Sequence, residues 1–394
     1  MQLKRILVTD GEQRAALAVV RSLGRAGYDV RVCSTRRTCL ASTSRYCRQH
    51  AQVGNALAEP ETFAAALKRL CEDWQIDVLV PITEPSALAL LSWRGIARVA
   101  LPSAESFRAV ADKRNLLEAA SSVGFAVPEQ TIVETPEQAR DLVPSGLGFP
   151  VVLKPARSVG GTGREQVKLT VLHAANWSQL QQRLKGLPAG AFPVLIQQRI
   201  KGPGTGIFLL RWNGLIRAVF AHRRLREKPP SGGVSVYCES IAADPMLVEL
   251  AARLLDRFDW QGVAMVELKI DSRTGRPYVM EVNGRFWGSL QLAIDAGVDF
   301  PRLLLECMGG RMPARMPRYL PGVRSRWWWG DVDQLLARMR RSRAALDLGE
   351  DSGGRLEAVR EFLALWRPGD RSDVFRFSDP LPLVRESVDW VARR

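Results

Sequence analysis

The sequence predicts an α/β protein, and three observations support this fold class. In the first hundred of 394 residues, short apolar runs alternate with segments of helical periodicity, a pattern typical of a parallel sheet covered on both faces. Two later apolar runs, 263–271 and 276–282, flank the turn-forming stretch 272–275 and predict a β-hairpin. The composition, 46% hydrophobic and 25% charged, is that of an ordinary globular chain long enough for two or three domains.

The first unit is expected to place strands at 4–10, 28–33 and 76–82 and helices at 13–26 and 60–74. The turn after the first strand has a single glycine, Gly11, where a dinucleotide-binding fingerprint has three, so an NAD or FAD site is disfavoured. Asp10, Gly11 and Glu84 lie at the ends of predicted strands, where α/β sheets bind ligands. Helix capping and turn formation explain these three residues equally well.

The second unit begins near Pro102, where Ser103 is expected to cap a helix that continues through Lys113 and stops at Gly124. The elements expected after it are strands at 127–133, 150–154, 167–172 and 193–200 and helices at 135–142 and 177–184. From about Arg311 the composition shifts to Arg, Pro and Trp, which indicates a C-terminal appendage. Its triplet 327–329 is interpreted as core packing, with a ligand or partner platform as the alternative.

The charge balance and the apolar pattern limit the class of protein. The formal net charge is +15, but no block of five like charges occurs, so we interpret the arginines as solvated surface and expect no nucleic-acid partner. The longest stretch without a charged residue, 169–182, is too polar for a membrane span. The N-terminus passes from two basic residues directly into a strand, so we expect a cytoplasmic protein. The six cysteines form no CxxC pair and complete no zinc pattern.

The hairpin contains the most informative polar residues. Centring its turn on 272–275 places Glu267 opposite Met280, and a single bulge, for which Gly275 is suited, would bring Glu267 beside Glu281. Adjacent like charges on a sheet are destabilising unless a cation neutralises them. Glu281 and Asn283 share a face, and two carboxylates with an amide oxygen suit Mg²⁺. The alternative is one glutamate in solvent and the other paired with a basic neighbour.

Two further features suit phosphate or carboxylate groups. Arg285 continues the alternation of Glu281 and Asn283 and carries a planar donor fork. Lys154, at a strand end, precedes a loop in which backbone N–H groups could approach phosphates; alternatively, this loop is a glycine-rich hairpin turn without a ligand. The loop is not a P-loop, because no GK[ST] follows. Its residues of interest are Ser158, Gly160, Gly161 and Gly163.

A third polar segment, AHRRLREKPPSGGVSV at 221–236, places several arginines before a pair of glycines. One interpretation is a mobile loop whose arginines, Arg223 among them, neutralise an anionic substrate. The other is a solvated basic strand edge with a flexible turn. The sequence leaves both interpretations open.

Four segments, taken together and in order, resemble the ATP-grasp superfamily, in particular its carboxylate–amine ligases and their relatives carbamoyl phosphate synthetase and biotin carboxylase. The segments are ADKRNLLEAASSVGFAVP, FPVVLKPARSVGGTG, VLIQQRIKG and VELKID…YVMEVNGRFWGSLQLAIDAGVDFP. The resemblance covers about residues 1–310. It implies a pre-ATP-grasp Rossmann-like domain at 1–101, an N-terminal lobe at 102–192, a C-terminal catalytic lobe at 193–310, and the appendage at 311–394.

The resemblance also implies roles for individual residues. Lys113 and Lys154 would hold ATP phosphates, the loop 158–163 would close over them, and Arg285 would steady the acyl phosphate. Arg285 would also orient the substrate carboxylate, with Arg223 as a second contact. The adenine would lie against Gln197, Gln198 and Ile200, and the Mg²⁺ or Mn²⁺ ligands would be Glu267, Glu281 and Asn283. Many relatives have an acidic residue near the adenine strand, whereas here none follows before Glu227, so how the ribose is bound stays open.

The implied activity is ATP-dependent activation of a carboxylate as an acyl phosphate, followed by transfer to an amine or similar nucleophile. The expected substrates are a small-molecule carboxylate and an amine, and a homo-oligomer is left open. Two alternatives remain at this point: an enzyme of the same superfamily that uses bicarbonate, and a non-catalytic ATP-binding module.

Overall fold

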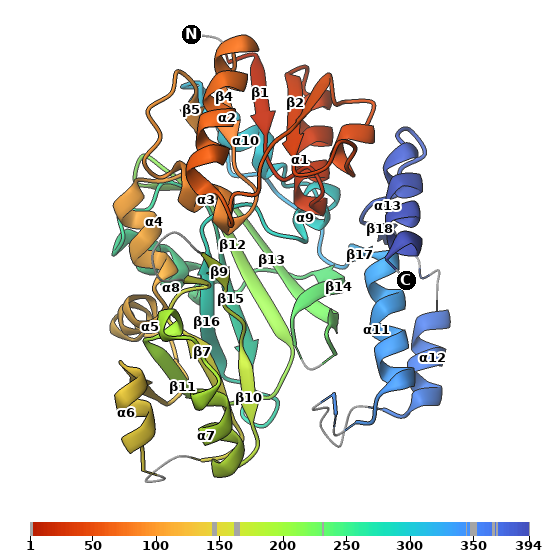
Figure 1. Ribbon diagram of the computed structural model, residues 1–394. Coiled ribbons are helices and arrows are strands. Elements are labelled where there is room, and N and C mark those ends of the chain that lie inside the picture. Colours follow the sequence, from red (N-terminus) through yellow and green to blue (C-terminus); the bar gives the residue numbers. More distant parts are fainter. Residues whose placement is uncertain are drawn as a thin grey trace.

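The computed structural model describes residues 3–143, 148–160, 166–230, 232–343, 345–346, 353–364, 367 and 369–393 (Figure 1). Its first sheet is parallel, in the order β3-β2-β1-β4-β5, as predicted. The helix α1 packs on one face of this sheet, and α2 and α3 pack on the other. The elements of this unit are β1 (Arg5–Val8), α1 (Arg14–Arg25), β2 (Asp29–Ser34), η1 (Ala41–Thr43), β3 (Gln49–Gln52), α2 (Pro60–Asp73), β4 (Val78–Val80), α3 (Glu84–Leu90) and β5 (Arg98–Val99).

The helix expected to run from Ser103 through Lys113 to Gly124 is interrupted, and that prediction was wrong in detail. The chain forms α4 (Ala104–Ala111) and α5 (Lys113–Ser122), with Asp112 extended between them (φ −83°, ψ 110°). The Asp112 carboxylate caps α5 by accepting from the backbone N–H of Arg114 at 3.0 Å. This break makes Lys113 the first residue of α5, where its backbone N–H donates to the Ala156 carbonyl at 2.9 Å.

A four-stranded antiparallel sheet, in the order β10-β7-β11-β6, forms the next layer, and α6 and α7 share its core. The strand expected at 167–172 is in fact two short strands with different partners, since β9 pairs with β8 and β10 pairs with β7. The elements are β6 (Gln130–Val133), α6 (Pro136–Asp141), β7 (Val151–Pro155), β8 (Val159–Gly160), β9 (Val167–Lys168), β10 (Leu172–Ala174), α7 (Trp177–Lys185), η2 (Ala189–Ala191) and β11 (Val194–Gln198).

The largest sheet has the order β16-β15-β12-β13-β14-β17-β18. One of its faces packs on α8 together with α4 and α5, and the other packs on α9, α10 and α1, so the first unit and this sheet share a core. The elements are β12 (Gly204–Trp212), β13 (Leu215–Lys228), β14 (Val234–Ser240), α8 (Pro245–Asp256), β15 (Gly262–Ile270), β16 (Pro277–Asn283), α9 (Leu290–Ala296), α10 (Phe300–Met308), β17 (Arg324–Arg326) and β18 (Asp370–Ser372).

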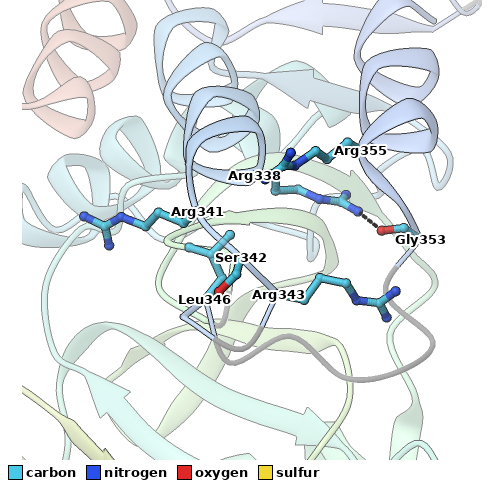
Figure 2. Close-up of a pocket in the computed structure, with 7 residues that line it drawn as sticks. All are labelled: Arg338, Arg341, Ser342, Arg343, Leu346, Gly353 and Arg355. Atoms are coloured by element: carbon cyan, nitrogen blue, oxygen red, sulfur yellow. Dashed lines mark hydrogen bonds between the residues drawn. The ribbon is translucent and has the colours of Figure 1, made fainter.

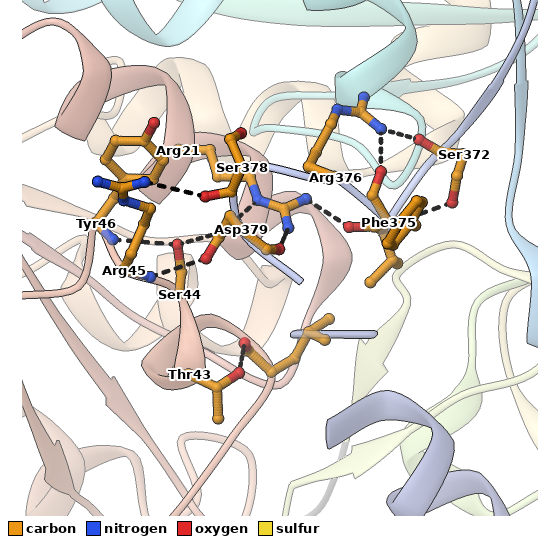
Figure 3. A network of polar contacts seen from close by, with 12 residues as sticks. Arg21, Thr43, Ser44, Arg45, Tyr46, Ser372, Phe375, Arg376, Ser378 and Asp379 are labelled. Atoms are coloured by element: carbon orange, nitrogen blue, oxygen red, sulfur yellow. Dashed lines mark hydrogen bonds and ion pairs between the residues drawn. The ribbon is translucent and has the colours of Figure 1, made fainter. Parts of the chain in front are cut away.

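The C-terminal segment is built into the molecule by its strands and by buried polar contacts. Besides β17 and β18 it contains α11 (Trp328–Arg340), α12 (Arg355–Leu363) and α13 (Leu381–Ala392). The Arg21 side chain of α1 is 1% exposed and donates to the Asp379 carboxylate at 2.8 Å (Figure 3). Trp327 packs against the core that the first unit and the largest sheet share, and Trp329 stacks on Trp390 at 4.2 Å between ring centroids. Trp328 is 36% exposed, so the core-packing interpretation of 327–329 holds for Trp327 and Trp329 but not for Trp328.

The described part of the chain includes no helix whose length and apolar character would allow it to cross a membrane. All six cysteines are unpaired thiols. The domain boundaries given above remain predictions.

Candidate active site

The hairpin of β15 and β16 brings Glu267 and Glu281 together. The two residues are direct partners in the antiparallel register, because the register shifts by one residue between Glu267 and Leu268. Leu268 pairs with Val279, which leaves Met280 as the extra residue. The predicted bulge is thus present, but it lies at Met280 and not at Gly275, which instead occupies the turn with φ +71°.

Arg224 lies against this pair from β13. Its guanidinium donates to Glu267 at 2.6 Å and to Glu227 at 2.8 Å, and its side chain is 9% exposed. A Cβ atom on Gly204 would lie 2.8 Å from the Arg224 Cδ atom, so the glycine leaves the path of this side chain open. The two carboxylates raise the pKa of Arg224, although its burial opposes them. The sequence did not single out this arginine.

Two lysines approach Glu281 from other elements. Burial lowers the pKa of Lys154, on β7, to about 8, with Lys113 acting in the same direction and Glu281 opposing. Lys154 Nζ contacts the sulfur of Met280 at 3.7 Å. Burial alone would raise the pKa of Glu281, but the ammonium groups of Lys113 and Lys154 outweigh it and lower that pKa. At Glu267, burial is the larger effect and the pKa is raised.

Asn283 and Arg285 continue the cluster beyond Glu281. The amide nitrogen of Asn283 donates to Glu281 at 3.1 Å, and its amide oxygen accepts from Arg285 at 3.3 Å. The three residues predicted to share a face thus form one hydrogen-bonded chain. The Asn283 oxygen is directed at Arg285, so half a turn of the amide is needed before this oxygen faces the glutamates.

Glu84 joins this group from the first unit. It is the first residue of α3, whose start is held by Asp10, because the Asp10 carboxylate accepts from the Thr83 backbone N–H at 3.1 Å and from the Ser86 hydroxyl at 2.8 Å. Burial raises the pKa of Glu84, and the positive charges of Arg285 and Lys113, together with the Ser158 hydroxyl, oppose this rise. Its position, at the carboxyl end of β4 beside the switch in strand order, is the place where α/β sheets bind ligands.

The glycine-rich loop begins beside these groups. Lys113 Nζ donates to the Ser158 hydroxyl at 3.2 Å. Gly160 pairs with Val167, and a Cβ atom on it would lie 2.4 Å from the Gly190 carbonyl oxygen, so a larger residue does not fit. Gly161 and Gly163 lie outside the described residues.

The predicted adenine strand is β11 with the residues that follow it. Gln197 is 1% exposed, and its amide nitrogen donates to Gln130 at 2.7 Å. The Gln197 amide oxygen is buried and has no hydrogen-bond partner among the described residues, so it can accept from a ligand. Gln198 is exposed and Ile200 is buried.

The structure does not bring Arg223 to this cluster. Arg223 pairs with Thr205, the neighbour of Leu268, and its side chain therefore lies on the opposite face of the sheet from Glu267. There its guanidinium donates to Glu239 at 2.6 Å, and its side chain is 54% exposed. The adjacent residue, Arg224, occupies the place that the sequence assigned to Arg223.

The residues fit a hard divalent cation by the chemistry of their donors. Two carboxylates in direct register supply the oxygen ligands that Mg²⁺ prefers, and Asn283 adds an amide. Among the described residues, no group of three His, Cys, Asp or Glu is placed to hold a metal ion. The fit therefore depends on this pair together with an amide, water or phosphate oxygen.

A separate basic hollow of about 190 Å³ lies in the C-terminal segment (Figure 2). Arg338 there donates to the Gly353 carbonyl at 2.7 Å. The hollow shares no described lining residue with the Glu267–Glu281 cluster and is separate from that site. Its described lining residues are Arg338, Arg341, Ser342, Arg343, Leu346, Gly353 and Arg355.

Comparison of the sequence with protein families matches residues 191–329 to a family described as "ATP-grasp in the biosynthetic pathway with Ter operon". A curated relative, a formate-dependent phosphoribosylglycinamide formyltransferase from Bordetella bronchiseptica, is 28% identical over 136 residues. This match covers 34% of the chain and 32% of that relative. The chain therefore spans about a third of the length of the curated relative that it matches.

Solved structures match over most of the chain. The L-amino acid ligase from Bacillus licheniformis is 16% identical with a TM-score of 0.60, and the match covers 81% of this chain and 76% of that one. The N5-carboxyaminoimidazole synthetase from Staphylococcus aureus is 17% identical with a TM-score of 0.62, over 82% and 83%. Residues 191–329 thus match an ATP-grasp family, and most of the chain shares its fold with these solved ligase and synthetase structures.

Proposed function

We propose that this protein is an ATP-dependent ligase that activates a carboxylate as an acyl phosphate, with ATP converted to ADP, and transfers the acyl group to an amine. The observation that carries the proposal is the direct pairing of Glu267 with Glu281, faced by Lys113 and Lys154. Two carboxylates suit a divalent cation, and two lysines suit the phosphates that such a cation accompanies. Similar folds have been solved with ADP and with MgADP.

The proposed nucleotide site uses groups from the four-stranded sheet, from the largest sheet and from the start of α5. Lys154 and Lys113 would bind phosphate oxygens, and the loop that starts at Ser158 would cover them. The Gln197 amide oxygen would accept from the amino group of adenine. Glu267 and Glu281, with Asn283 after rotation of its amide, would hold Mg²⁺ or Mn²⁺. The bound metal would neutralise charge on the phosphates and align the γ-phosphoryl group.

The proposed carboxylate site lies at Arg285. Its guanidinium is close to Glu84 and Asn283, and a planar fork can hold a carboxylate with one oxygen directed at the γ-phosphorus. Attack by that oxygen forms the acyl phosphate and releases ADP, and attack by the amine nitrogen on the acyl carbon then releases phosphate. Catalysis would come mainly from positioning and charge neutralisation.

Glu84 is the proposed contact for the amine. It reaches the site from the first unit, and its carboxylate can accept a hydrogen bond from an ammonium or amine group near Arg285. Because Asp10 fixes the start of α3, the carboxylate is held in place by a separate set of hydrogen bonds. Glu84→Gln should therefore raise KM for the amine more than KM for ATP.

The test is a screen for ADP release from ATP with pooled carboxylic acids and amines, followed by mass analysis of the products. An acid that stimulates ADP release and yields a hydroxamate with hydroxylamine demonstrates the activated acyl group. Glu281→Gln should abolish this signal and Arg223→Gln should retain it. Release of AMP and pyrophosphate would contradict the proposal, and ADP release that depends on bicarbonate alone would favour a carboxylase.

A further inference from the structure

The outer face of α13 carries an apolar stripe that no described part of the chain covers. Four of its residues are spaced three, four and three apart, and Phe377 precedes them by four. Their exposed fractions are 92% for Phe377, 60% for Leu381, 56% for Val384, 54% for Val388 and 62% for Val391. We call these five residues the α13 seam.

The helix that carries the seam is fixed to the body of the protein by its opposite face. Glu386 accepts from the Trp327 indole at 2.7 Å, Ser387 accepts from the Trp329 indole at 2.9 Å, and the Trp390 indole donates to Asp333 at 2.9 Å. The inner face is therefore occupied by specific polar contacts. The seam is consequently a fixed outward surface of the folded chain.

We infer that a second copy of this chain covers the seam, with the two α13 helices antiparallel across a two-fold axis. The spacing of Leu381, Val384, Val388 and Val391 reads the same in both directions, and its centre is Glu386. An antiparallel copy therefore places Leu381 against Val391 and Val384 against Val388, and the reverse on the other side. Such self-complementarity is what a two-fold interface requires, and three-four spacing is that of paired helices.

The area and the flanking charges agree with this occupant. The five side chains expose on the order of 500 Å², which is as large as the largest apolar patches of monomeric proteins. In the antiparallel register Phe377 has no counterpart on the partner's seam, so the contact rests on the four helix residues, and two such faces would bury on the order of 700 Å², the size of a weak interface. Beside the seam, Asp389 accepts from Arg385 at 2.5 Å and lies 3.2 Å from Arg36, so these charges are already paired within one copy.

The first experiment measures mass by light scattering and sedimentation over a range of micromolar concentrations. The full chain should have twice its 43.8 kDa mass, and Val388→Glu should return it to the monomer. Leu356→Glu is the matched control, because Leu356 is an 88% exposed leucine on another helix of the same segment, and this variant should remain dimeric. A native circular dichroism spectrum and a cooperative unfolding transition will show that both variants are folded.

A second experiment tests the register. Antiparallel pairing predicts that the double variant Val384→Cys/Val388→Cys forms an intermolecular disulfide under mild oxidation, at least about tenfold faster than either single variant, because the cysteines meet only in the mixed pair. Parallel helices would instead bring like positions together and cross-link each single variant. A monomeric wild-type chain, a Val388→Glu dimer, or cross-linking of the single variants would each overturn the proposal. The measurements do not depend on the proposed ligase activity.

Discussion

Two buried charge clusters of this molecule are built on opposite plans. At the contact between α1 and the C-terminal segment, the Arg21 guanidinium donates to Asp379 and to the carbonyls of Val374 and Asp379. The Asp379 carboxylate also accepts from the Ser44 hydroxyl at 2.7 Å and from the Arg45 backbone N–H at 2.9 Å. Each guanidinium nitrogen of Arg21 donates a hydrogen bond and each carboxylate oxygen of Asp379 accepts at least one (Figure 3).

The Glu267–Glu281 cluster places groups of the same charge close together: the two carboxylates are neighbours, and so are the ammonium groups of Lys113 and Lys154. The two carboxylates are register partners, and Lys113 contributes to the lowered pKa of its neighbour Lys154. Lys154 Nζ contacts a methionine sulfur and has no hydrogen bond to a carboxylate among the described residues. A cluster that holds a structure together satisfies its own charges, as at Arg21. Groups that repel their like neighbours suit ligands that bring the missing charges, here a cation and a polyanion.

Removing one carboxylate of the cluster is expected to have the largest effect on activity and almost none on stability. Glu281→Gln should lower kcat for ADP formation by about a thousandfold, or about 4 kcal/mol, since the site loses a ligand charge where the phosphoryl group is transferred. The free energy of unfolding should fall only slightly, because the lowered pKa of Glu281 means that Lys113 and Lys154 stabilise its charge on balance, while the like charge of Glu267 offsets part of that gain. Steady-state kinetics and urea unfolding measure the two quantities. Glu249→Gln, at an exposed glutamate of α8, is the control.

Changes to the Arg21–Asp379 pair should have the opposite result, a large loss of stability with little effect on activity. Asp379→Asn leaves the Arg21 guanidinium buried without a charged partner, so the free energy of unfolding should fall by about 3 kcal/mol. Activity per folded molecule should be retained. The midpoint of urea unfolding measures the loss, and Asp256→Asn is the comparison, because Asp256 pairs with Arg211 but is 53% exposed and should matter by less than about 1 kcal/mol. Equal losses for the two variants would show that burial of the Arg21 pair is not what stabilises it.

The adjacent arginines of β13 test which charged residues belong to the site, because Arg224 contacts Glu267 and Arg223 contacts Glu239 on the other face of the sheet. Arg224→Gln removes the cation held against Glu267 and should lower kcat/KM for ATP by about thirtyfold, or about 2 kcal/mol. Arg223→Gln, one residue away and on the opposite face, should change kcat/KM by less than about threefold. The pair is measured by ATP titration at fixed carboxylate and amine. The reverse ranking would restore Arg223 to the site.

The sequence was sufficient for features that depend on local pattern. Alternation of apolar runs and helices predicted the parallel first sheet, and the spacing of Glu281, Asn283 and Arg285 placed them on one face, as the structure shows. The pairing of Glu267 with Glu281 was predicted because a bulge was invoked. The position of the bulge could not be predicted, since a one-residue shift can occur anywhere along the two strands.

The sequence could not predict features that depend on how strands far apart in the chain are aligned. Choosing between Arg223 and Arg224 needs the alignment of β13 with β12, and β13 itself shifts register near Arg224. The close approach of Gly204 to Arg224 is a signal that becomes readable only when that alignment is known. Glu84 was noticed as a strand-end residue, but nothing local shows that its charge interacts with that of Arg285, because the two residues lie about two hundred positions apart in the sequence.

The smallest expected effect tests a carboxylate that is buried without a full set of partners. Burial raises the pKa of Glu386 from 4.5 to about 7, despite the hydrogen bond from Trp327, and its second oxygen has no partner among the described residues. A carboxyl whose pKa is raised in the folded state stabilises that state most below pH 4.5, and this contribution is lost as pH rises to about 7. Glu386→Gln keeps the acceptor for Trp327 and removes the titration. Its unfolding free energy should exceed that of wild type by about 1–2 kcal/mol near pH 8, and the difference should shrink steadily as the pH falls toward 4.5. Urea unfolding at several pH values measures this difference, and a gap that does not vary with pH would show that Glu386 is charged in the folded protein throughout.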